Sequence, residues 1–121
     1  DFATFLADQD EGRLQAFNAG WIMDYPDPED ILDVKFHSGS PLNDVGYKNA
    51  EVDKLLDAAR IEANANRRLD LYRQVEKKIV DDAAWLPLYF SQAHVVVKDS
   101  VKNWFEPPMV VPRLRFVELA R

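Results

Sequence analysis

Apolar and polar positions recur with two different periods along this chain, and the periods divide it into predicted helices and strands. The clearest helical pattern lies in residues 50–61, where apolar side chains recur at i, i+3, i+4 and i+7: Val52, Leu55, Leu56 and Ala59. Asn49 precedes this pattern and is a residue type that caps helices. After a break at residues 64–66, a long helix is predicted to begin at Arg67, with a core face of Leu71, Tyr72, Val75 and Ile79.

Two shorter helices are predicted nearer the start of the chain. The first lies within residues 1–12, where Asp1 is available as N-cap and Gly12 as a stop. The second begins after Asp27-Pro28, with Asp27 at the N-cap and Pro28 at the first helical position, and ends at residues 38–41. Acidic residues in its first turn suit the helix dipole.

Four apolar segments have the composition of β-strands. Residues 14–23 form a nearly continuous apolar run that ends at Asp24, which is typical of a strand buried on both faces. Residues 86–90 and 94–97 are rich in aromatic and β-branched side chains, and residues 114–119 alternate. Pro87 confines the first of these to a strand start or an edge. The three prolines in residues 104–112 predict a loop.

Composition narrows the class of protein. The chain has 121 residues, 47% of them hydrophobic, with a formal charge of −6, which suits one globular domain or part of one. The acidic balance argues against nucleic acid or an anionic membrane surface as a partner. There is no cysteine, which excludes disulfides and thiolate metal sites, and no apolar run approaches the ~20 residues of a membrane span. Because the chain begins with Asp, we expect further sequence upstream, including any secretion signal.

Asp24 is the first candidate for chemistry. It terminates the predicted strand, and ligands of open α/β sheets collect beyond the carboxyl ends of strands. Pro26 and Pro28 stiffen the turn that follows. One interpretation is an anchor for a cationic group, most simply an ammonium. The alternative, which sequence leaves open, is a turn acid satisfied by nearby backbone N–H groups.

Catalytic and metal sites find less support. The acids Asp24, Asp27, Glu29 and Asp30 lack the spacing of a calcium loop, and helix capping accounts for the last three. A single segment is a poor source of opposed catalytic carboxylates, and no nucleophile elbow or phosphate loop occurs. His37 and His94 have no ligand spacing, and aromatic residues in strands belong to cores by default. Trp21 is the exception, because it lies on the segment that leads to Asp24. We therefore expect no enzyme, no metal and no cofactor.

Four motifs in order resemble one family. Gly20-Trp21 through Asp24-Tyr25-Pro26-Asp27-Pro28, then residues 46–56, then Arg68 through Glu76, then Asp82 through Leu88 are similar to the C-terminal portion of the peptide- and oligopeptide-binding proteins of ABC importers, the family 5 extracellular solute-binding proteins. The resemblance covers nearly all of this chain but only about the last quarter of a family member. It implies an α/β fold of the periplasmic binding protein type II class.

The resemblance also implies a place in the fold for each part of the chain and a role for the site residues. Residues 1–86 would form part of the C-terminal lobe of a two-lobed protein, and residues 87–121 the returning crossover strands and the C-terminal tail. Asp24 would pair with the α-amino group of a bound peptide, while the backbone of Gly20, Trp21, Ile22 and Met23 runs alongside it. The implied partners are a peptide, the missing N-terminal lobe and the membrane subunits of a permease, in a periplasmic or lipid-anchored extracytoplasmic protein. Other members bind nickel complexes, sugars or haem, so a different solute is the alternative, and a carboxylate-dependent hydrolase is a more distant one.

Overall fold

The computed structural model describes residues 1–92, 94–105 and 114–120, and it divides into two compact units, residues 1–86 and 87–121. The first unit holds four helices: α1 (Phe2–Asp10), α2 (Glu29–Phe36), α3 (Ala50–Ile61) and α4 (Ala65–Asp81). The assignment of the two units to a lobe and to crossover strands stays a prediction.

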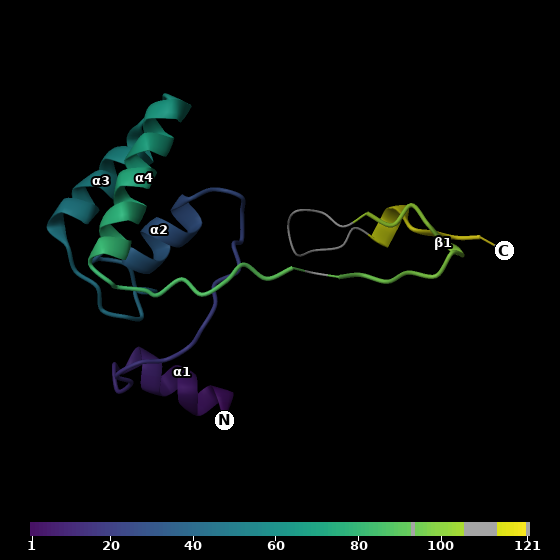
Figure 1. Cartoon of the computed structure of the whole chain (residues 1–121), viewed down its shortest axis with the longest axis horizontal. Helices are drawn as coiled ribbons and strands as arrows, with labels where there is room; N and C mark the ends of the chain where they lie inside the picture. The colour runs from purple at the N-terminus through teal and green to yellow at the C-terminus, as the bar shows by residue number, and fades with distance from the viewer. Residues whose placement is uncertain (93, 106–113, 121) are drawn as a thin grey trace. The chain divides into compact units, whose positions relative to one another are not determined.

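The core of the first unit lies where α2, α3 and α4 meet. Helices α3 and α4 lie side by side and α2 packs against both of them (Figure 1). The predicted apolar faces supply the buried cluster, which comprises Phe36, Val52, Leu56, Ala59, Tyr72, Val75 and Ile79. Leu55 and Leu71 were also predicted to face the core, but they are only partly buried and pack against the edge of this cluster. The helical prediction for this region is therefore confirmed.

The observed helix ends match the predicted capping residues in part. Asp1 precedes α1, but its side chain makes no capping hydrogen bond. The Asn49 side chain accepts hydrogen bonds from the N–H groups of Glu51 and Val52, as predicted. Helix α4 begins at Ala65 and not at Arg67, because Asn64 caps it in the same way. Helix α2 begins at Glu29, one residue later than predicted, although Asp27 Oδ1 still accepts from Glu29 N at 2.9 Å.

Three of the four strand predictions are wrong for the chain by itself. Residues 14–23, 86–90 and 94–97 have irregular backbone. A strand exists only where a neighbour completes its hydrogen bonds, and within the described residues no segment pairs with these three. Residues 114–119 divide into a 3₁₀ turn, Leu114–Phe116, and the short strand β2 (Glu118–Leu119).

Among its described residues, the second unit contains one small β-ladder. Strand β1 (Val101–Lys102) pairs antiparallel with β2 (Glu118–Leu119), with Val101 opposite Leu119. The Ala120 N–H extends the ladder by donating to the Ser100 carbonyl at 2.7 Å. Of the predicted loop, residues 106–112 lie outside the described residues.

Candidate functional site

Asp24 lies at the surface on the irregular segment that leads into α2. It is exposed, and in the part of the chain that the structure describes no hydrogen bond or ion pair engages its carboxylate. Its backbone N–H, in contrast, donates to Asp30 Oδ2 at 2.9 Å. The main chain of Asp24 is therefore fastened, while no described backbone N–H group satisfies its carboxylate as a turn acid would require.

The other predicted site residues share this segment. Gly20 and Ile22 are exposed, and Trp21 and Met23 are half-buried. A side chain at Gly20 would meet no atom within 4 Å, so open space borders the backbone there. Within the segment from Gly20 to Asp24, the backbone at Gly20 and the carboxylate of Asp24 are thus accessible from the surface.

Trp21 is held on its edge and on one face. Its indole Nε1 donates to Asp30 Oδ2 at 3.0 Å, and Lys35 Nζ lies 4.7 Å from the ring centroid. Lys35 is buried and pairs with Asp44 at 2.8 Å, and Gln9 of α1 donates to the same Asp44 oxygen. Trp21 therefore anchors the segment to α2, and its indole N–H is already engaged.

Sequence reasoning missed Asp30 and Arg68 as parts of this site. Asp30 fits the pattern of a first-turn helix acid, so its spacing gave no sign of its contacts. Trp21 could have pointed to Asp30, because the indole N–H of a tryptophan that packs against the protein needs a hydrogen-bond acceptor nearby. Arg68 lies in one of the family motifs but had been assigned no role.

Arg68 ties the turn after Asp24 to α4. Its guanidinium donates to both Asp27 oxygens at 2.7 and 2.8 Å and to the Tyr72 hydroxyl at 3.0 Å, and its Nε donates to the Ala59 carbonyl at 3.2 Å. The hydrogen bonds from Arg68 hold the pKa of the Asp27 carboxyl below its usual value, and the same contact raises the pKa of Arg68. Residues on both sides of Asp24 are consequently fixed.

Acids at the start of α2 act on Tyr25, the residue that follows Asp24. The pKa of Tyr25 is raised, first by desolvation and then by the charges of Glu29, Asp30 and Asp27. Asp27 has Arg68 as its counter-ion, whereas no counter-ion faces Asp24 among the described residues. Such a site favours a cationic ligand group over an anionic one.

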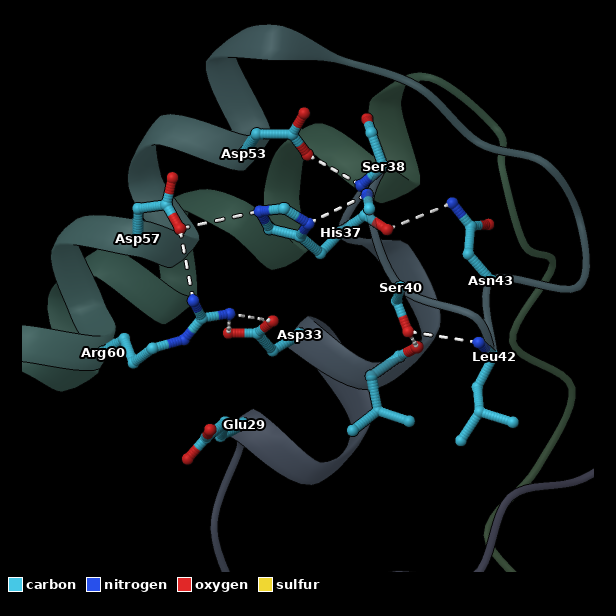
Figure 2. A network of polar contacts seen from close by, with 12 residues as sticks. Glu29, Asp33, His37, Ser38, Ser40, Leu42, Asn43, Asp53, Asp57 and Arg60 are labelled. Atoms are coloured by element: carbon cyan, nitrogen blue, oxygen red, sulfur yellow. Dashed lines mark hydrogen bonds and ion pairs between the residues drawn. The ribbon is translucent and has the colours of Figure 1, made fainter.

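Acids of α2 and α3 hold these two helices and the loop after α2 together. Asp33 pairs with Arg60 of α3 at 2.7 Å, and Asp53 accepts from the Ser38 N–H at 2.9 Å (Figure 2). His37 accepts from Gly39 N at 3.0 Å and faces Asp57 at 3.5 Å, while His94 is exposed. Figure 2 shows this network along the contact between α2 and α3.

Over the described ranges, no group of three or more His, Asp or Glu side chains is placed to hold a metal ion. No helix found there has the length and apolarity to cross a membrane.

The chain is similar to part of several peptide-binding proteins. It is 32% identical over 109 residues to the dipeptide-binding protein DppE of Bacillus subtilis, a match that covers 90% of this chain and 20% of that protein. It is 31% identical over 90 residues to the periplasmic oligopeptide-binding protein OppA of Salmonella typhimurium, covering 74% of this chain and 16% of that protein. The chain thus spans about a fifth of the length of these relatives. No family model matches it.

The fold of the chain is also similar to part of a solved peptide-binding protein. The ABC transporter-associated periplasmic binding protein DppA from Helicobacter pylori, in complex with peptide STSA, superposes with a TM-score of 0.82 at 25% identity. The match covers all of this chain and 25% of that one. In sequence and in fold, the chain therefore matches a segment of the periplasmic peptide-binding proteins, as the four motifs predicted.

Proposed function

We propose that this chain is part of the C-terminal lobe of a two-lobed solute-binding subunit that captures a peptide for an ABC importer. The observation that carries the proposal is the exposed carboxylate of Asp24, which none of the described residues engages, on a segment whose main chain is fixed by Asp30. The names of the relatives, which are dipeptide- and oligopeptide-binding proteins, support peptide as the solute.

The proposed binding mode uses the carboxylate of Asp24 and the backbone of the segment before it. The carboxylate of Asp24 receives the α-ammonium group of the peptide, and the backbone from Gly20 to Met23 runs beside the peptide main chain. A charge-assisted hydrogen bond contributes roughly 1.5–3 kcal/mol net. Because Arg68 neutralises Asp27, the charge of the ligand would be directed to Asp24.

The protein is proposed to bind its solute without chemical turnover. The acids near Asp24 already have partners: Asp27 pairs with Arg68 and Asp33 with Arg60. Asp30 accepts from the Trp21 indole and from the Asp24 N–H. The remaining contacts to the peptide would come from the other lobe, and the complex would be delivered to permease subunits outside the cytoplasm. This chain alone should accordingly bind peptide weakly or not at all.

The direct test is the Asp24→Asn substitution in the complete two-lobed protein, with isothermal calorimetry as the measurement. Affinity for a peptide with a free amine should fall by about 30-fold or more, because one partner of a desolvated charge pair is lost. The N-acetylated form of the same peptide should bind the two proteins within a few-fold of each other.

Glu76→Gln is the matched control, because it neutralises an exposed carboxylate on α4 far along the chain from the segment. It should change neither affinity. Equal losses for the free and acetylated peptides in Asp24→Asn would remove Asp24 from the anchor role. Release of shortened peptide during the titration would favour a hydrolase over a transporter subunit.

A further inference from the structure

The carboxylate of Asp30 is buried at the start of α2 and turns back toward the preceding segment. Asp30 is only 2% exposed. A single oxygen, Oδ2, accepts from Trp21 Nε1 at 3.0 Å and from Asp24 N at 2.9 Å. One carboxylate therefore fastens both ends of the stretch from Trp21 to Asp24.

This arrangement differs from the usual task of an acid in a first helical turn. Such acids accept from the free N–H groups of their own helix or favour its dipole. Here the Glu29 N–H is served by Asp27 Oδ1, and the hydrogen bonds of Asp30 reach six and nine residues back along the chain. The contacts of Asp30 thus serve the segment in front of the helix.

A second support acts on the same side chain. Lys35, one turn further along α2, is 5% exposed and places its ammonium 4.7 Å from the centre of the Trp21 ring. Asp44 holds Lys35 in place at 2.8 Å. With its edge bound to Asp30 and one face against Lys35, the Trp21 ring has little freedom to rotate.

We propose that Asp30 is a positioning residue for solute binding: it fixes Trp21 and the main chain of Asp24, so that the Asp24 carboxylate is held outward before the ligand arrives. This inference rests on the proposed function, since it names the group that pre-organises the Asp24 anchor. A segment that is already ordered loses less conformational freedom when the ligand binds.

Three variants of the complete binding protein test the inference. Asp30→Ala removes the acceptor, and Asp30→Asn keeps an oxygen that can receive both donors. Asp33→Ala is the control, because Asp33 is a similarly buried acid of α2 that bonds to Arg60 and not to the segment. Circular dichroism shows whether each variant is folded.

The first readout needs no ligand. In ¹⁵N NMR, the indole signal that disappears in Trp21→Phe should shift toward that of an exposed indole in Asp30→Ala, and should stay near its wild-type position in Asp30→Asn and Asp33→Ala. The Asp24 amide should exchange more slowly than the neighbouring amides in the wild-type protein. An Asp24 amide that exchanges freely, or an indole signal that Asp30→Ala leaves in place, overturns the inference even if one variant fails to fold.

The second readout is affinity. Asp30→Ala should weaken a free-amine peptide about 10-fold and its acetylated form less, Asp30→Asn should recover most of the loss, and Asp33→Ala should leave both within about 2-fold of wild type. Equal losses in Asp30→Ala and Asp33→Ala would make Asp30 merely structural and overturn its positioning role. A wild-type protein that binds no peptide overturns the proposed function instead, and the indole and amide signals then still decide whether Asp30 fixes the segment.

Discussion

The sequence predicts both the helical pair α3–α4 and strands at residues 14–23, 86–90 and 94–97, yet of these only the helices form in this chain. An α-helix completes its backbone hydrogen bonds within its own sequence. The apolar faces of α3 and α4 are buried against each other and against α2, all within this chain. A strand needs a neighbour, and the apolar segments have none among the described residues.

Burial shows the same contrast. Val52, Leu56 and Val75 are fully buried, whereas Phe90 and Val96 are 101% and 97% exposed. Large apolar side chains at that exposure are typical of a surface that packs against something in the folded protein. A strand-like composition therefore indicates that a segment packs against apolar surface, but not which segment supplies its hydrogen bonds. An amphipathic helical pattern indicates both, because a helix supplies its own.

The core of the helical pair gives the largest expected effect. Leu56→Ala should lower the free energy of unfolding by about 2–5 kcal/mol, because it leaves a cavity at a position that is 0% exposed. The measurement is urea unfolding of the 121-residue chain, followed by the helical circular dichroism signal.

Ile61→Ala is the control on the same helix, since Ile61 is 84% exposed and should cost within about 0.5 kcal/mol. Similar losses for the two variants would mean that α3 and α4 do not share the described core, and the comparison between the two kinds of region would fail.

The candidate site shows how far sequence reasoning reached. The position of Asp24 after an apolar run was enough to select it, and its exposure is compatible with the anchor role, which stays a prediction. The fastening of Trp21 by Asp30 and Lys35 could not be predicted, because it depends on how the irregular segment returns across α2. The break expected at residues 64–66 was wrong for a simpler reason: Asn64 ends the loop as a cap, and a cap and a break have the same composition.

Arg68 gives the next largest effect, since it joins the segment region to the helical region. Arg68→Ala should cost about 2 kcal/mol of stability, because it leaves Asp27 and the Ala59 carbonyl without their donor. Arg73→Ala is the control: its pair with Asp70 is largely exposed, and the loss should stay within about 0.5 kcal/mol. The same urea titration measures both.

The acid limb of the stability curve checks the same contact. The folded-state pKa of Asp27 is below its ordinary value of 3.8, so the stabilisation is complete above that value and is lost as the pH falls through the folded-state pKa. Wild type should lose this part of its stability in that acidic range, and Arg68→Ala should lose less there. Parallel acid limbs for the two proteins would contradict the pairing of Asp27 with Arg68.

The smallest effect belongs to the helix cap, and it tests whether the helical region is specified locally. Asn64→Ala should destabilise the chain by about 1 kcal/mol, because the side chain accepts from the N–H groups of Asn66 and Arg67. Asn64→Ser should recover most of this loss, since serine caps nearly as well. Asn66→Ala, at an exposed position two residues on, should be neutral or slightly stabilising, because alanine is the better helix former. If Asn66→Ala costs as much as Asn64→Ala, the start of α4 is set by tertiary contacts, and even the helices of this chain depend on their surroundings as the strands do.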